Sequence, residues 1–223
     1  MATGPGQENE VVRDEALRFG VDCPRIDVDE DDVLTRYVMA AQAYSADVIV
    51  RITGDCPLID AGVVDDTISA LAENDFASNV FDRTYPEGLD CEVMYMDTLL
   101  KLDRLVKGPE REHVCSYVYT SNRFSVVSVM GDQDYSHLKW CVDTEEDYER
   151  VAPMLANGIL PYEEMLDKYG RTDEAPGDGS ATSSYREANG DDGPEPWGST
   201  ADEFYEARVR RKPERFIDTE GWS

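Results

Sequence analysis

Basic residues are scarce in this sequence. Its 223 residues contain 21 Lys and Arg, only five of them lysines, against 48 Asp and Glu, for a formal net charge of −27 at pH 7. Nucleic acids and anionic membrane surfaces are bound through basic patches, so the composition argues against both as partners. The acids are spread over the whole chain, which is typical of a salt-adapted (halophilic) protein, because a Debye length of about 3 Å at 1 M salt screens self-repulsion.

Long apolar runs and paired cysteines are also missing. No stretch of about 18 apolar residues could span a membrane, and no charged segment followed by an apolar one opens the chain as a secretion signal. We therefore expect a cytoplasmic protein. The five cysteines are solitary, without a C-x-x-C pair, which argues against a zinc site or a disulfide framework.

Apolar periodicity alternates between helix and strand from Glu8 to about Lys168. The pattern predicts helices at 8–19, 29–44, 61–74, 97–106, 110–120 and 145–157, and strands at 46–52, 76–81, 89–95, 124–130 and 138–142. Strands that alternate with helices predict an α/β fold with a mostly parallel sheet flanked by helices.

The composition divides the chain into three parts. Residues 1–170 form the predicted α/β domain. Residues 171–200 are rich in Gly, Ser, Asp and Pro, which predicts a disordered linker. Residues 201–223 resume a helical pattern as far as Pro213, which predicts a C-terminal helix and tail.

Two aspartates directly follow predicted strands. Asp55 comes after strand 46–52, and Asp143 comes after strand 138–142. In parallel α/β sheets ligands bind beyond the carboxyl ends of the strands. Magnesium takes one or two carboxylates and leaves its other positions to water and substrate phosphates. The pair is therefore a candidate Mg²⁺ site, although each aspartate alone would also suit a helix N-cap or a turn.

Four segments in order, "RITGDCPLID", "YPEGLDCEV", "EREHV" and "LKWCVDTEEDYERV", resemble cytidylyltransferases of the spore-coat polysaccharide type. These are relatives of the acylneuraminate and 3-deoxy-manno-octulosonate cytidylyltransferases, and the resemblance covers about residues 1–155. It implies a nucleotide-diphospho-sugar transferase fold, which is Rossmann-like. It also implies a reaction in which the hydroxyl of a sugar or sugar acid attacks the α-phosphorus of CTP and releases pyrophosphate, in polysaccharide precursor biosynthesis.

The resemblance implies that Asp55 and Asp143 are the catalytic, metal-binding carboxylates. Phosphoryl transfer depends on positioning and on neutralising the charge of the triphosphate, so no covalent nucleophile is needed. Arg51 is a candidate phosphate ligand, with local pairing to an acid as the alternative.

The other motifs are expected to shape the sugar pocket. Gly88 allows a close backbone approach. Asp90 and Glu92 alternate onto one strand face, where they could accept hydrogen bonds from sugar hydroxyls, although Glu92 would equally suit a solvent-facing position. Three further substrate-binding candidates open a predicted helix near the same rim: Arg111, Glu112 and His113. The histidine would orient substrate or act as a base, or be structural.

One family feature is missing. Members begin with a strand and a basic Gly-rich loop that holds the triphosphate, and the opening "MATGPGQEN" instead resembles the end of the second strand. We therefore expect that the domain is truncated at its N-terminus and that Met1 is not the natural start.

Two alternative functions stay open. One is a glycosyltransferase of similar fold, for which Asp132-Gln133-Asp134 has the D-x-D spelling. The other is a non-catalytic sugar-binding remnant, so whether this chain is an active enzyme is undecided. The sequence also leaves the identity of the sugar and the oligomeric state open, a homodimer among the options.

Overall fold

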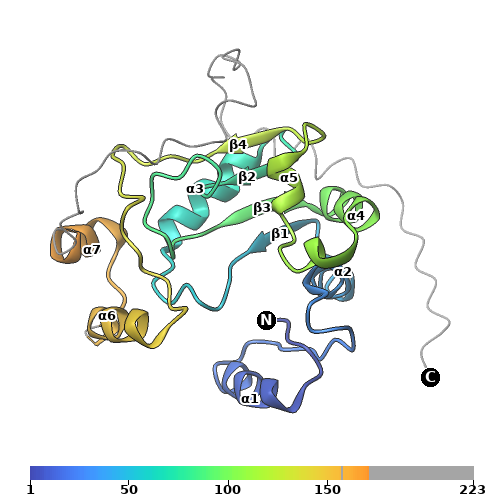
Figure 1. The fold of residues 1–223 in the computed structure, drawn as a ribbon, viewed down its shortest axis with the longest axis horizontal. Coiled ribbons are helices and arrows are strands. Elements are labelled where there is room, and N and C mark those ends of the chain that lie inside the picture. The colour runs from blue at the N-terminus through green and yellow to red at the C-terminus, as the bar shows by residue number, and fades with distance from the viewer. Residues whose placement is uncertain (157, 171–223) are drawn as a thin grey trace. The chain divides into compact units, whose positions relative to one another are not determined.

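A four-stranded sheet forms the centre of the computed structural model, which describes residues 1–156 and 158–170 (Figure 1). The strands are β1 (Val48–Arg51), β2 (Phe76–Ser78), β3 (Glu92–Tyr95) and β4 (Val126–Ser128), in the spatial order β1-β3-β2-β4. The predicted linker and C-terminal helix lie outside the described residues.

The sheet is mixed. β2 and β4 are parallel, whereas β3 is antiparallel to both β1 and β2. Three strands therefore run in the expected common direction and β3 runs against them. The reversal follows from the connection between β2 and β3, which contains no helix, because parallel neighbours need a longer crossover that is usually helical.

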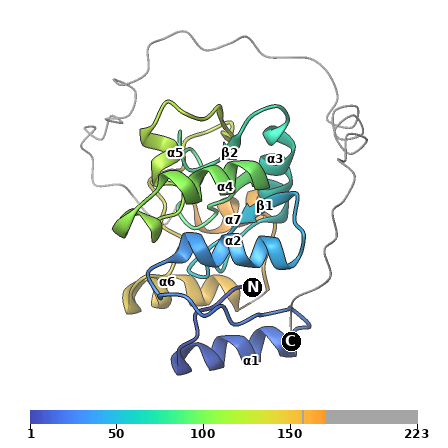
Figure 2. The ribbon, with the colours of Figure 1, turned by 90° about the vertical axis from the view of Figure 1, so that its right-hand side faces the viewer.

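Helices cover both faces of the sheet. α2 (Val33–Ala43) and α4 (Met96–Leu105) pack together on one face, and α3 (Ala61–Leu71) covers the other (Figures 1 and 2). The remaining helical elements are η1 (Gln7–Asn9), α1 (Glu10–Arg18), η2 (Gly108–Arg111), α5 (Ser116–Thr120), α6 (Glu145–Leu155) and α7 (Tyr162–Tyr169). No described helix combines the length and the apolar character of a transmembrane span.

Side-chain caps set the starts of several helices. The Asp32 carboxylate accepts from the Thr35 amide, so α2 begins at Val33 and not within the acidic run before it. Thr144 and Asp147 form a reciprocal capping box that starts α6. The predicted helix 110–120 is interrupted at Val114, whose φ of +52° is left-handed and does not continue a helix.

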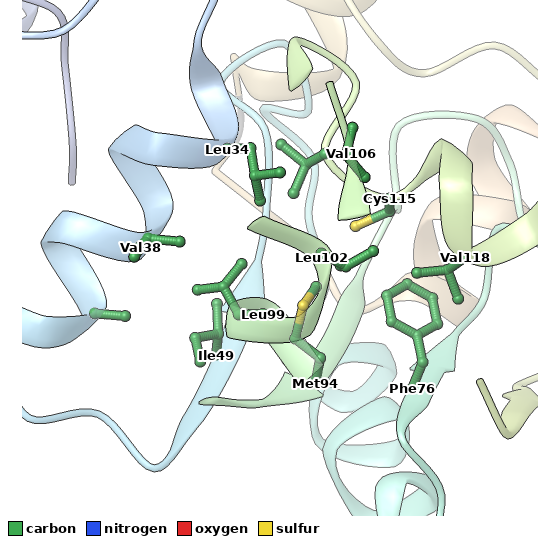
Figure 3. Packing of buried hydrophobic residues seen from close by; sticks show 12 residues of the cluster. Leu34, Val38, Ile49, Phe76, Met94, Leu99, Leu102, Val106, Cys115 and Val118 are labelled. Atoms are coloured by element: carbon green, nitrogen blue, oxygen red, sulfur yellow. The ribbon is translucent and has the colours of Figure 1, made fainter. Parts of the chain in front are cut away.

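The main core lies between α2, α4 and the sheet (Figure 3). Leu34 and Val38 of α2 meet Leu99 and Leu102 of α4, above Ile49, Phe76 and Met94 of the strands. A second buried cluster gathers Leu58, Val63, Tyr85, Leu89, Leu138, Trp140, Val151, Met154 and Met165.

The prediction of a strand at 138–142 is wrong. This segment is held by a single isolated bridge between Glu87 and Lys139. The Glu87 amide donates to the Leu138 carbonyl (2.9 Å), and the Trp140 amide donates to the Glu87 carbonyl (2.6 Å). Leu138 and Trp140 are buried in the second cluster, so the apolar pattern of this segment reflects packing in that cluster and not a place in the four-stranded sheet.

Candidate functional site

The loop that carries Asp55 leaves the carboxyl end of β1 and leads into α3. Its interior is anchored, because Cys56 is buried and the Cys56 amide donates to the Thr53 carbonyl (3.3 Å). Asp60 ends the loop by capping α3 through the Val63 amide (2.9 Å). Asp55 itself is exposed. The loop is therefore fixed on both sides of a carboxylate that reaches solvent.

The segment that carries Asp143 lies against this loop. The amide of Val142 donates a hydrogen bond to the Asp55 carbonyl oxygen (2.9 Å). The backbones of two residues far apart in the sequence are thereby brought side by side. Their metal-binding role stays a prediction.

A lysine accompanies Asp143. Lys139 Nζ lies 2.7 Å from Asp143 Oδ2 and 2.9 Å from Asp147 Oδ2. The hydrogen bond from Lys139, aided by the Cys141 thiol, holds the pKa of Asp143 below its usual range. Sequence reasoning overlooked Lys139, although a lysine inside an apolar segment of a lysine-poor chain was a signal.

Asp55 and Asp143 are the residues of this site that could contribute to a metal site. In the described part of the chain, no three His, Cys, Asp or Glu side chains are grouped so as to hold a metal ion. Asp55 is exposed and the Asp143 side chain is 48% exposed, so both carboxylates can be reached by water and phosphate. Two accessible carboxylates are the kind of partial ligand set that Mg²⁺ uses.

Arg51 and Glu92 form an ion pair inside the protein. They face each other across β1 and β3, with Arg51 Nη1 2.5 Å from Glu92 Oε2. The Arg51 side chain is 20% exposed and that of Glu92 only 5%. The Tyr119 hydroxyl donates to the other Glu92 oxygen, and lies 3.0 Å from the Ser78 hydroxyl. Burial raises the pKa of Tyr119, and the Glu92 charge raises it further.

Both oxygens of the Glu92 carboxylate are therefore engaged within the protein, and the residue is not the solvent-facing strand residue of the alternative interpretation. Arg51 pairs with an acid, as the alternative interpretation of this residue expected. Whether either residue also contacts substrate stays a prediction.

The turn before β3 contains Gly88 and Asp90. Gly88 has a φ of +108°, and a Cβ added there would lie 2.5 Å from the Cys141 amide nitrogen. The backbone of Gly88 thus closely approaches the backbone of Trp140 and Cys141, in the segment that leads to Asp143. Asp90 precedes β3, which starts at Glu92, and it forms a two-pronged ion pair with Arg83 at 2.6 and 2.8 Å. Its predicted contact with sugar remains open.

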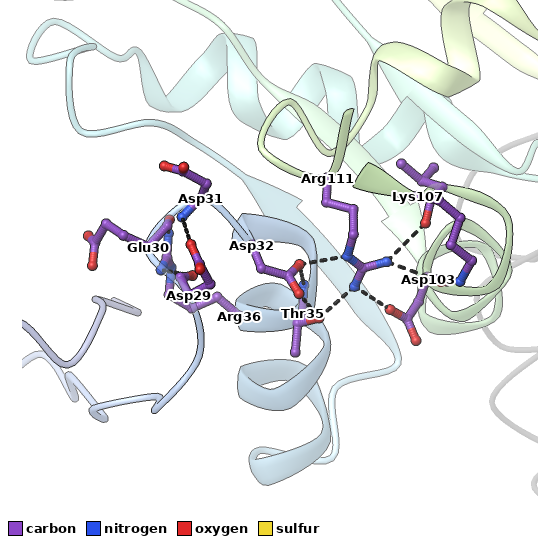
Figure 4. A network of polar contacts seen from close by, with 10 residues as sticks. Asp29, Glu30, Asp31, Asp32, Thr35, Arg36, Asp103, Lys107 and Arg111 are labelled. Carbon is purple, nitrogen blue, oxygen red and sulfur yellow. Dashed lines mark hydrogen bonds and ion pairs between the residues drawn. The ribbon is translucent and has the colours of Figure 1, made fainter. Parts of the chain in front are cut away.

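Arg111 ties α2 to α4 (Figure 4). Its guanidinium lies 2.7 Å from Asp32 and 2.7 Å from Asp103, and it also donates to the Thr35 hydroxyl. Its neighbours Glu112 and His113 are exposed between η2 and α5. Within residues 1–156 and 158–170, no hydrogen bond or ion pair links these three residues to Asp55 or Asp143. Their substrate-binding role stays a prediction.

Comparisons with known proteins identify the family. The cytidylyltransferase family model matches residues 8–135, which is more than half of the chain. The chain belongs to the cytidylyltransferase family. The matched range includes Asp55 and ends before Asp143.

Two relatives and one solved structure resemble the chain. An uncharacterized protein of Methanocaldococcus jannaschii is 35% identical over 54% of this chain and 51% of its own length. The spore coat polysaccharide biosynthesis protein SpsF of Bacillus subtilis is 28% identical over 55% of this chain and 52% of its own. The chain thus spans about half the length of either relative.

The solved structure is a cytidylyltransferase from Leptospira borgpetersenii. It matches with a TM-score of 0.70 and 30% identity, over 75% of this chain and 73% of that chain. The expected α/β fold, a sheet flanked by helices, is therefore confirmed, and the sheet of this chain is mixed.

Proposed function

We propose that this cytidylyltransferase-family chain transfers CMP from CTP to a sugar or sugar acid and releases pyrophosphate, in the synthesis of polysaccharide precursors. The observation that carries the proposal is the hydrogen bond from the Val142 amide to the Asp55 carbonyl, which joins the two carboxylate-bearing segments of the site. Family membership and the likeness to a solved cytidylyltransferase support it.

Asp55 and Asp143 would hold the Mg²⁺ ion. When bound there, the ion would neutralise charge on the triphosphate, which is the main demand of phosphoryl transfer. On metal binding, the Lys139 ammonium group would leave Asp143 and bind a phosphate oxygen instead. The Lys139 side chain is 37% exposed, which leaves room for this movement. Arg51, paired with Glu92 at the end of β1, would instead fix the strand from which the Asp55 loop departs.

The glycosyltransferase alternative has little support. Its D-x-D spelling falls in a loop, where the Asp134 carboxylate accepts from the Ser136 amide (2.9 Å) as a turn residue does. The proposal also includes a cytoplasmic location and a high-salt habitat, both resting on composition, and a homodimer as the assembly to test first.

Pyrophosphate release tests the proposal. The full chain is incubated in molar KCl with CTP, MgCl₂ and a panel of neutral sugars, amino sugars and sugar acids. We expect CTP-dependent pyrophosphate release, lost in Asp55→Asn and retained in Asp65→Asn, where Asp65 is likewise exposed but lies on α3. A nucleoside diphosphate released from a nucleotide sugar would favour the glycosyltransferase. No product with any sugar, from a folded chain, would refute the activity and favour the sugar-binding remnant.

A further inference from the structure

Apolar side chains that are exposed to solvent gather around α1. Thirteen large apolar side chains are exposed among the described residues, and six of them lie within residues 1–21. Val11 and Phe19 are the most exposed of the thirteen, at 76% each. Exposed apolar residues that are scattered singly are normal, whereas a contiguous patch marks an interaction site.

An apolar groove runs along this side of α1. Its volume is about 430 Å³, and its lining consists of Met1, Val11, Val12, Glu15, Ala16, Phe19 and Val21. The one charged residue among them is Glu15, which already has a counter-ion on the same helix, since Arg18 Nη1 lies 2.6 Å from Glu15 Oε2. The groove therefore carries no unbalanced charge that would attract a charged ligand.

The opposite side of α1 is attached to the domain through polar contacts. Glu10 pairs with Arg25, and Arg13 Nε donates to the Cys23 carbonyl (3.3 Å). Ala16 is the one buried residue of α1, and the three buried clusters of the described residues include no residue of this helix. Figures 1 and 2 both show α1 at the periphery, away from the sheet. The helix thus turns its apolar side outward, the reverse of an ordinary surface helix.

The short length of α1 makes this exposed side significant. Isolated helices of fewer than about 12–15 residues are marginal in water, and most helical stability in proteins comes from packing of the apolar face. α1 has nine residues, and the groove along its apolar side is open among the described residues. A partner that covers this side is therefore expected.

We propose that the apolar side of α1 is a dimer interface, which packs against α1 of a second copy of this chain in antiparallel orientation. Val11 and Phe19 lie eight residues apart, or about 12 Å along a helix that rises about 1.5 Å per residue. A two-fold axis near Glu15 therefore places each Val11 against the partner's Phe19. The interface is isologous, since both copies contribute the same side chains.

The charges beside the groove fit this arrangement. Arg18 and Asp14 lie on the same flank of α1, and both are exposed. A two-fold axis across antiparallel helices brings the same flank of each copy together, so Arg18 of one copy lies beside Asp14 of the other. Antiparallel helix dipoles add a favourable interaction. At molar salt the net charge of −27 is screened within about 3 Å, so it does not keep two copies apart.

Sedimentation equilibrium of the full chain in molar KCl tests the interface. We expect a monomer–dimer equilibrium with a dissociation constant of roughly 1–100 µM, because the interface is small. Val11→Ser with Phe19→Ser should raise this constant about tenfold or more, since two apolar contacts are removed from each copy. Leu17→Ser is the matched control and should change it less than about twofold, because Leu17 is 47% exposed on the same helix but does not line the groove.

Three results would overturn the inference. They are a chain that stays monomeric up to about 1 mM, a dimer that the double variant leaves unchanged, and an equal effect of the Leu17 control. In each case the groove would have another occupant. The measurement uses no CTP and no sugar, so it stands or falls independently of the proposed activity.

A charge exchange between copies tests the antiparallel arrangement without relying on the stability of α1. In the lowest KCl concentration that keeps the chain folded, Arg18→Glu alone and Asp14→Arg alone should each weaken the dimer about three- to tenfold, because like charges then face each other. A mixture of the two variant chains should associate within about threefold of the wild type, since each chain then presents opposite charges to the other. A mixture that associates no better than the separate variants would contradict the proposed interface.

Discussion

Replacing Glu92 by Gln leaves the Arg51 guanidinium partly buried without its counter-charge. The shape of the side chain is kept, and its amide oxygen can still accept one hydrogen bond. Breaking a buried ion pair by removing one partner costs about 3–5 kcal/mol. Because 20% of the Arg51 side chain remains exposed, we take the lower end, a loss of about 3 kcal/mol in the free energy of unfolding.

Urea unfolding at constant molar KCl measures this loss. With an m-value of about 2 kcal/mol/M, the midpoint should fall by about 1.5 M. Glu15→Gln is the matched control, since it breaks an ion pair with Arg18 in which the side chains of Arg18 and Glu15 are 73% and 52% exposed. Solvent-accessible pairs are worth only about 0–1 kcal/mol, so the control should move the midpoint by less than about 0.5 M.

A double-mutant cycle decides whether the effect belongs to the pair. Arg51→Met with Glu92→Met should destabilise the protein by less than the sum of the two single variants, because it leaves no buried charge unpaired. Strict additivity, or a loss below about 1 kcal/mol in Glu92→Gln, would refute the reasoning that Arg51 and Glu92 stabilise the end of β1 as a unit.

Three further predictions concern the fold and its surroundings. Gly88→Ala should lower the free energy of unfolding by about 2–4 kcal/mol in urea, because the added methyl group would lie 2.5 Å from the Cys141 nitrogen at a φ of +108°. Gly108→Ala is the control and should cost about 1 kcal/mol, because Gly108 has a φ of +65° but open space around it. Equal costs in the two variants would contradict the close approach at Gly88. The pKa of Asp143 is lowered from its ordinary 3.8 in the folded state, so its stabilisation is present above pH 3.8 and is lost as the pH falls further. Urea midpoints at pH 5, 4 and 3 should therefore fall less in Lys139→Gln than in the wild type, and parallel profiles would argue against the ion pair. The melting temperature should rise between low and molar KCl because salt screens the net charge of −27, and a constant value would count against salt adaptation.

The sequence by itself was sufficient for the family resemblance, the α/β class and the place of most helices and strands. These depend on local order, since apolar periodicity and capping residues such as Asp60 and Thr144 act over a few neighbouring residues. The position of Asp55 just beyond a predicted strand was visible for the same reason. The separation of 171–223 from the domain rests on composition and lies outside the described residues.

Other features were decided only by the tertiary structure. The reversal of β3, the missing strand at 138–142 and the helix α7 depend on which segments pair in space, and a local apolar pattern does not specify its partner. The partners of the charged side chains were also decided by the tertiary structure. The sequence makes Arg51 and Arg111 candidate substrate ligands, and the structure adds that each meets carboxylates brought from other strands or helices. Long-range packing also joins the segment of Asp143 to the loop of Asp55, because the hydrogen bond from the Val142 amide to the Asp55 carbonyl exists only once distant elements have packed.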